Sequence, residues 1–269
     1  EFNKVGGVWV EGQTIEPSST YSSAIFGESL TMHGDYLVVG ASGDYTTISS
    51  QGSVYIFEDQ GGTWTEIQKL VSPNAEIGSY FGKEVVSNGT DLIIAAHGED
   101  TTAINTGRIY TYTETGGTFT NSQELYKTDR GIHDFLGDVD HVGLTNDTLV
   151  IADGVNFYEW TKTGSVWSTT ETQTIPVNSE ATAISINGDI VLVGSITDSV
   201  GATNSGKVSV FQKQGGIWTL IHTLKQDVPE TNDYFGRAVH VTDSVLLVCA
   251  THDEITGTDT GAIYSFELV

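Results

Sequence analysis

The chain has 269 residues, with 35 acidic and 11 basic side chains, and its formal net charge is −24. This balance excludes nucleic acid as a partner, because Lys and Arg must neutralise the phosphates of such a ligand and are scarce here. Thirty-one glycines stand beside only four prolines, in a chain rich in Thr, Val and Tyr, a composition typical of short strands and tight turns rather than helices.

A Gly-Gly-x-Trp pattern, or a close variant of it, recurs along the chain. Its aromatic residues are Trp9, Trp64, Phe119, Trp167 and Trp218, at spacings of 55, 55, 48 and 51 residues. A second ladder of Phe-Gly pairs begins at Phe26, Phe81, Phe135 (with Leu136 inserted) and Phe235, and its fourth copy is degenerate around residues 180–181. A fixed period of this length indicates five structural repeats of about 50–55 residues.

In chain order, the sequence predicts a strand at residues 5–15 and then four strands in each repeat. In the first complete repeat these are residues 29–33, a very apolar segment at 36–41, an alternating one at 53–57 and a Trp-led one at 63–70, all bounded by turn residues. The last segment, residues 262–268, is predicted as a third strand without a fourth. We therefore predict an all-β fold: a five-bladed β-propeller of four-stranded antiparallel blades.

The two unpaired end segments complete one blade if residues 5–15 pair with residues 262–268. The prediction is thus a single domain over residues 1–269, closed by pairing of the N-terminal strand with the C-terminal strand. Closure of this kind removes open sheet edges.

The Phe26-Gly27 start, the Gly34-Asp35 turn and the strand Leu37–Ala41 resemble FG-GAP repeats, best known from the heads of integrin α chains. The resemblance covers nearly the whole chain, although propellers of the integrin kind have seven blades. Such repeats often hold calcium between their first two strands. Here turns of two to four residues, such as Asn187-Gly188-Asp189, lack the five or more oxygens that calcium requires. We expect that the family's calcium site is deleted and that no cofactor is required.

Strand order predicts two unlike faces. Tight turns join strands one to two and three to four on one face, whereas the connections 42–52, 97–107, 196–206 and 251–261 all emerge on the other, together with the blade-to-blade connections. Binding residues collect on loops that a rigid scaffold carries, so we expect function on this long-loop face.

One repeat position on the long-loop face is acidic in four repeats and Asn156 in the third. The acids are Asp44, Glu99, Asp198 and Asp253. They could ligate a cation such as Ca²⁺ or accept hydrogen bonds from sugar hydroxyls. The alternative, which we favour, is that each bonds its own backbone in an Asx-turn or is simply solvated.

The third repeat lacks its long loop at Asp153-Gly154, and the next connection, residues 177–181, is also short. This predicts a notch in the rim. Ionisable residues are densest beside it, and a polar notch is a candidate pocket for a small ligand or a peptide. The candidate ligand-binding residues are His133, Asp134, Asp140, His141 and Asp153.

Three functions remain open at this point. The first is a non-catalytic recognition or adhesion module, a monomeric domain or a module of a larger assembly, that binds a protein or carbohydrate surface through the long-loop face. The second is a lectin with glycan sites between blades. The third, the minority interpretation, is a glycosidase with carboxylates in the central funnel, drawn from Glu28, Glu84, Asp138 and Asp140.

Two further expectations concern location. No apolar run reaches the length needed to cross a bilayer as a helix, so we expect no membrane insertion. The acidic composition and two N-x-T sequons, at Asn88 and Asn146, lead us to expect an extracellular or cell-surface protein.

Overall fold

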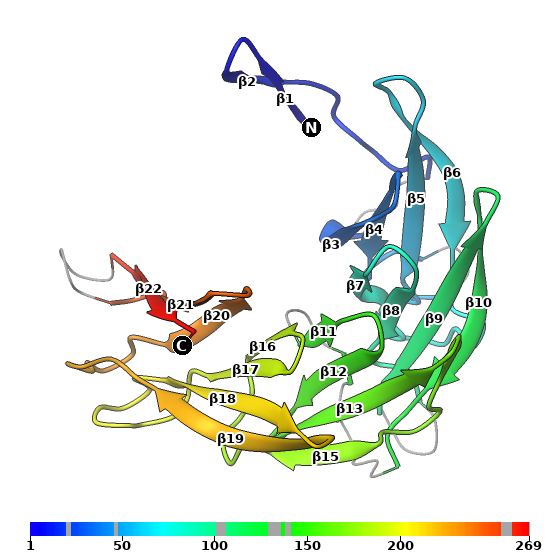
Figure 1. Ribbon diagram of the computed structural model, residues 1–269. Coiled ribbons are helices and arrows are strands. Elements are labelled where there is room, and N and C mark those ends of the chain that lie inside the picture. Colours follow the sequence, from blue (N-terminus) through cyan, green and yellow to red (C-terminus); the bar gives the residue numbers. More distant parts are fainter. Residues whose placement is uncertain are drawn as a thin grey trace. The chain divides into compact units, whose positions relative to one another are not determined.

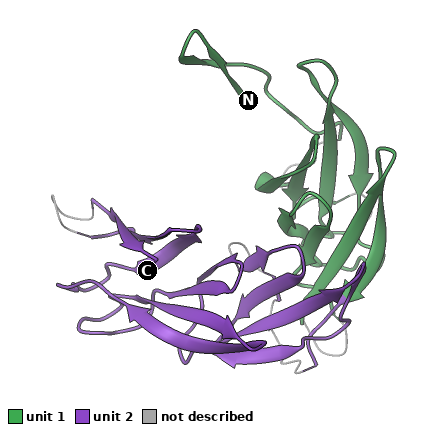
Figure 2. Cartoon of the chain, in the orientation of Figure 1, with its two compact units in different colours: residues 1–124 green, residues 125–269 purple. Residues whose placement is uncertain are grey.

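The computed structural model describes residues 1–19, 23–45, 48–100, 106–128, 136–137, 141–253 and 260–268 (Figure 1). These residues form strands and no helix, so none of them belongs to a helix that could cross a membrane. The chain divides into two compact units, residues 1–124 and 125–269 (Figure 2). Each unit is described by itself.

The first unit holds a hairpin and two four-stranded antiparallel sheets. The hairpin is β1 (Phe2–Val5) and β2 (Val8–Glu11). The first sheet is β3 (Phe26–His33), β4 (Tyr36–Ala41), β5 (Ser53–Asp59) and β6 (Trp64–Leu70). The second is β7 (Phe81–Ser87), β8 (Leu92–Ala96), β9 (Arg108–Thr115) and β10 (Thr118–Leu125), whose last residue already belongs to the second unit.

The second unit holds three sheets. One contains β11 (Val142–Leu144), β12 (Thr148–Asp153), β13 (Asn156–Thr163), β14 (Val166–Trp167) and β15 (Gln173–Pro176). The next contains β16 (Ala183–Asn187), β17 (Ile190–Ser195), β18 (Lys207–Gln214) and β19 (Ile217–Leu224). The last contains β20 (Phe235–Val241), β21 (Val245–Ala250) and β22 (Ala262–Glu267).

The predicted strand pattern is confirmed in part; the segment at residues 5–15, predicted as one strand, instead contains the Gly6-Gly7 turn followed by β2. In the first sheet, the predicted strands 36–41 and 63–70 correspond to β4 and β6 within one residue. Consecutive strands pair antiparallel, and β3 joins β4 through the two-residue turn Gly34-Asp35. The third repeat does lack its long loop, because Asp153 at the end of β12 pairs with Asn156 at the start of β13.

The core lies between neighbouring sheets, which we call blades 1 to 5 in chain order from β3. Val38, Val54 and Ile56 of blade 1 pack in one buried cluster with Phe81 and Tyr110 of blade 2. The second strands β4 and β8 are buried along most of their length, which is why they are almost continuously apolar.

The predicted pairing of the N-terminal strand with the C-terminal strand is not found in the described residues. Instead β2 pairs with β1, and Phe2 lies opposite Glu11 just as Phe57 lies opposite Glu66 in blade 1. The register of the hairpin therefore matches that of the third and fourth strands of blade 1. The turn Gly6-Gly7 favours pairing between these two adjacent strands, because both glycines take the left-handed conformation that a tight hairpin needs.

Blade 5 has three strands in the part of the chain that the structure describes, and its outer strand is β22. Ile263 on β22 is 75% exposed, whereas Val54, Ile109 and Val208 at the same position of the complete blades are 0% exposed. The number of blades and the closure of a ring therefore remain predictions, as does the single domain.

Candidate functional site

The long loops that leave the second strands share one frame. In each of four blades the backbone N–H of a glycine donates to the carbonyl of an acidic residue eight positions earlier, at 2.9–3.0 Å. The pairs are Gly52 with Asp44, Gly107 with Glu99, Gly206 with Asp198 and Gly261 with Asp253. The frame thus encloses seven residues every time, and all four glycines have left-handed backbones, with φ from 72° to 81°.

In blade 1 the acid of the frame is also the centre of a buried polar cluster. Lys69 Nζ lies 2.8 Å from Asp44 Oδ2, and the hydroxyl of Tyr55 donates to the same oxygen at 2.6 Å. Burial opposes ionisation of the Asp44 carboxyl, but the contacts with Lys69 and Tyr55 outweigh it and lower the pKa. Asp44 is therefore a carboxylate held by the protein's own cation.

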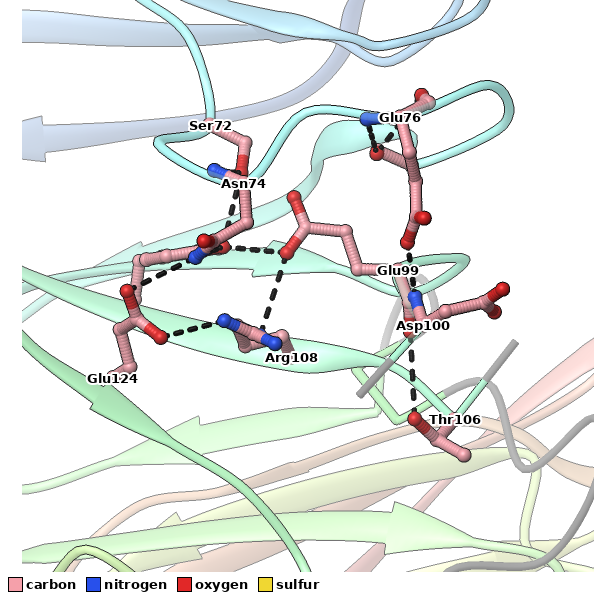
Figure 3. A network of polar contacts seen from close by, with 10 residues as sticks. Ser72, Asn74, Glu76, Glu99, Asp100, Thr106, Arg108 and Glu124 are labelled. Atoms are coloured by element: carbon pink, nitrogen blue, oxygen red, sulfur yellow. Dashed lines mark hydrogen bonds and ion pairs between the residues drawn. The ribbon is translucent and has the colours of Figure 1, made fainter. Parts of the chain in front are cut away.

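The equivalent cluster in blade 2 is larger and less well neutralised (Figure 3). Tyr110 donates to Glu99 Oε2 at 2.5 Å, while Arg108 Nε is 3.6 Å from that oxygen and Arg108 Nη1 is 2.6 Å from Glu124. The other carboxylate oxygen of Glu99 is buried without a hydrogen bond. Burial raises the pKa of Glu99, and the hydrogen bonds from Ser72 and Tyr110 offset only part of that rise.

The remaining two acids are paired in the same manner. Lys207 lies 2.8 Å from Asp198, which also accepts a hydrogen bond from Ser179. Asp253 accepts hydrogen bonds from Tyr264 and from Gln226, the latter at 2.5 Å. Each acid therefore ties its loop to the third strand or to the segment entering its blade.

These contacts bear on the predicted metal role of Asp44, Glu99, Asp198 and Asp253. No three His, Cys, Asp or Glu side chains in the described ranges gather closely enough to hold a metal ion. Protein cations already occupy three of the acids, and an added metal ion would be repelled by them. The Asx-turn alternative also understates their role, because their side-chain partners lie 9 to 27 residues away.

Long loops of two blades are joined to the entry segment of the next blade by backbone hydrogen bonds. The amides of Gly78, Tyr80 and Phe81 donate to Ser49, Ser50 and Gln51 at 3.0–3.1 Å. In the second unit the same three bonds recur at 2.9–3.2 Å, from Asn232, Tyr234 and Phe235 to Thr203, Asn204 and Ser205.

A tyrosine directly before Phe-Gly stands beside each of these junctions. Tyr80 meets His97 with ring centroids 5.0 Å apart and an interplanar angle of 77°. Tyr234 meets His252 with the same distance and angle. The histidines come from adjacent rather than identical repeat positions, His97 two residues before its acid and His252 one residue before.

We name the two groups the tyrosine sites: Ser50, Tyr80 and His97 form the first, and Asn204, Tyr234 and His252 form the second. Each lies within one unit, on the long-loop face. The sequence analysis did not predict these sites, because no recognised motif spacing links Tyr80 to His97 or Tyr234 to His252. The signal was available, since the residue before Phe-Gly is tyrosine in two repeats.

Of the five residues predicted at the notch, His133, Asp134 and Asp140 lie outside the described residues. His141 and Asp153 are held close together, because the carbonyl of His141 accepts from Ala152 on β12. Asp153 forms an ion pair with Lys127, whose Nζ also lies 4.7 Å from the centroid of the Tyr158 ring. The notch pocket itself stays a prediction.

The inner-strand acids considered for glycosidase chemistry show one clear contact. Glu28 forms an ion pair with Lys83 at 2.7 Å and accepts a hydrogen bond from Ser42. An acid paired in this way is poorly suited to donate a proton to a leaving group. Asp138 and Asp140 lie outside the part of the chain that the structure describes.

Comparison with known proteins agrees with the repeat. No curated protein sequence matches the chain. A solved structure from Bacteroides uniformis, provisionally named a 6-phosphogluconolactonase, is 13% identical, with a TM-score of 0.55 over 90% of this chain and 68% of that one. A likeness at this identity shows the fold alone.

The profile described as the FG-GAP repeat matches residues 9–57, 64–112 and 218–266, together more than half of the chain. Each match begins at the tryptophan of one fourth strand and ends at the third-strand aromatic of the following sheet. The family repeat therefore spans the junction between blades, where the tyrosine sites lie. On this match, the chain belongs to the FG-GAP repeat family.

Proposed function

We propose that the protein is a non-catalytic recognition module whose long-loop face binds a protein or carbohydrate surface. One observation carries the proposal: four loops of equal length are closed by the same acid and glycine, yet their seven inner residues differ. A constant frame around varied contents is the arrangement expected of a binding surface on a rigid scaffold.

The amino-acid composition of the four loops limits the chemical class of the partner. The loops span residues 45–51, 100–106, 199–205 and 254–260, which include no Lys or Arg, and Ser and Thr together fill almost half of the positions. Such loops offer hydroxyl, amide and carboxylate groups and repel anions, in a chain whose net charge is already −24. They favour an uncharged, hydrogen-bonding partner.

We also propose, from the repeats, a closed propeller of five blades that forms one domain, works as a monomer or within a larger assembly, and acts outside the cell or at its surface. The sequons support the last point, since Asn146 is exposed in the turn between β11 and β12. A metal role for the acids of the loop frames is not part of this proposal, because three of them already pair with Lys or Arg.

An array that carries oligosaccharides beside immobilised extracellular proteins tests the proposed function. One variant replaces residues 199–205 by a Gly-Ser sequence of equal length and keeps Asp198 and Gly206. A matched variant, Asp147→Ser with Asp189→Ser, changes exposed residues on the tight-turn face. We expect the loop variant to lose binding and the turn variant to retain it. Binding that survives the loop change, or no binding to either class, contradicts the proposal.

The same array reports on the enzyme alternative. Oligosaccharides recovered after incubation should be unchanged in length. Release of shorter products by the wild-type protein would show catalysis and would overturn the non-catalytic assignment.

A further inference from the structure

The tyrosine sites share an unusual backbone. Tyr80 and Tyr234 have φ of 52° and 54°, and Ser50 and Asn204, which accept their amide hydrogen bonds, have φ of 50° and 51°. Glycine occupies most of the left-handed positions in this chain. A bulky residue is disfavoured in this region, so tyrosine stands here against a local backbone penalty.

The hydroxyl groups of these two tyrosines also differ from those of the loop frames. Tyr55, Tyr110 and Tyr264 each donate to the acid of a frame. No hydrogen bond joins the hydroxyl of Tyr80 or Tyr234 to another of the residues that the structure describes. Both rings are half-buried, so a fixed ring leaves its polar tip available.

The neighbouring groups are polar and uncharged or acidic. Asn204 Nδ2 donates to Asn232 Oδ1 at 2.9 Å beside the second site, and Glu76 accepts from the amide of Asp100 beside the first. The nearest cations along the chain are Lys83, Lys207 and Arg237, of which the first two are ion-paired with Glu28 and Asp198. A fixed aromatic ring, a free phenol and flanking amides suit a ligand with one apolar face and many hydroxyl groups.

We infer that the tyrosine sites bind neutral sugar residues, one at each site, with the tyrosine ring against the C–H face of a pyranose and its hydroxyl bonded to a ring substituent. This deepens the proposed function and rests on it. A protein partner fits the sites less well, because a stable protein interface buries on the order of 1,200 Å² or more and each site is small and repeated.

A matched substitution separates binding from folding. Asparagine tolerates the left-handed backbone, so Tyr80→Asn and Tyr234→Asn relieve strain while they remove the ring. Ile25 stands at the same repeat position of blade 1, with φ of 55° and no histidine contact, and Ile25→Asn is the control. All three variants should unfold at or above the wild-type midpoint.

Titration calorimetry with the best neutral oligosaccharide from the array gives the stoichiometry. We expect two ligands per chain for the wild type and for Ile25→Asn, one for either tyrosine variant, and none for the double variant. Sites that stay filled in the double variant, or an array on which only sulfated or sialylated glycans bind, would overturn the inference.

Failure here can be told from failure of the proposed function. If an immobilised protein binds, no oligosaccharide does, and the loop variant loses that binding, the inference of sugar sites is contradicted while the proposed recognition module is supported. If neither class of partner binds, both proposals are contradicted.

Discussion

Asp44 and Glu99 occupy the same repeat position, yet their surroundings shift their pKa values in opposite directions. Lys69 lies 2.8 Å from Asp44, whereas Arg108 lies 3.6 Å from the nearer oxygen of Glu99, and each acid has one carboxylate oxygen that is buried without a hydrogen bond. The closer cation lets pairing outweigh burial at Asp44, whereas burial dominates at Glu99.

The stability of the two blades should therefore depend on pH with opposite sign. The lowered pKa of Asp44 means that its contribution is present above the ordinary Asp value and is lost as pH falls through the folded pKa. The raised pKa of Glu99 means that its contribution is largest when the group is protonated and is lost as pH rises.

Asp44→Asn and Glu99→Gln test this difference. At pH 7 we expect Asp44→Asn to lower the free energy of unfolding by roughly 2 kcal/mol, since a charged hydrogen-bond partner is removed. Glu99→Gln should cost less at pH 7 than at pH 4, because it abolishes ionisation of a buried carboxyl. Urea unfolding from pH 4 to pH 8 measures both, and parallel pH curves for the two variants would contradict the pKa shifts.

At this scale the sequence predicts positions but not partners. The four acids were found from the repeat, whereas Lys69 lies 25 residues after Asp44 and no repeat spacing points to it. One signal was overlooked: a tyrosine follows the acid by eleven residues at Tyr55, Tyr110 and Tyr264. The rings of these tyrosines pack in the hydrophobic clusters, while their hydroxyl groups donate to the acids.

At the scale of the element, a glycine that closes a loop frame can meet two requirements at once, as Gly52 and Gly206 do. Gly206 has φ of 81°, and a Cβ atom there would lie 2.1 Å from the carbonyl oxygen of Phe235 on the following blade. Gly188, in a tight turn of the opposite face, has φ of 54° and open space around its Cα. Of these two glycines, Gly206 alone combines a left-handed backbone with close approach of a neighbouring strand.

Gly206→Ala should therefore destabilise the protein far more than Gly188→Ala. We expect roughly 1 kcal/mol for Gly188→Ala, the ordinary penalty of a left-handed alanine. In Gly206→Ala the new Cβ must also displace the backbone of Phe235, so the loss of unfolding free energy should be at least twice as large. Denaturant unfolding of the two variants gives the comparison, and equal losses would show that the blade junction is not rigid.

At the scale of the whole molecule, the strands and their order follow from the repeat, but the pairing of the first strand does not. Phe2 stands seven residues before Trp9, as Phe57 stands before Trp64. This spacing would have predicted the strand β1, which the sequence analysis does not include. Phe2 and Phe266 thus fill the same repeat position. In a closed ring β22 would have to take the place of β1 beside β2.

Cysteine pairs test the proposed ring in a Cys249→Ser background. Val10 lies opposite Asn3 in the hairpin. In blade 1 the residue equivalent to Val10 is Thr65, which lies opposite Glu58. Because Glu267 is the residue of β22 equivalent to Glu58, a closed ring would place Glu267 opposite Val10. We expect Val10→Cys with Glu267→Cys to form an intramolecular disulfide under mild oxidation. Exclusive formation of the bond by Val10→Cys with Asn3→Cys would refute closure.

The bonds between a loop and the next blade are made by peptide groups alone, from Tyr80 to Ser50 and from Tyr234 to Asn204. Every residue except proline supplies the same amide and carbonyl. The side chains that contact a partner can therefore change by mutation while the backbone hydrogen bonds between the loop and the next blade are preserved. A lineage that carries this fold can change what it recognises with little cost to its architecture.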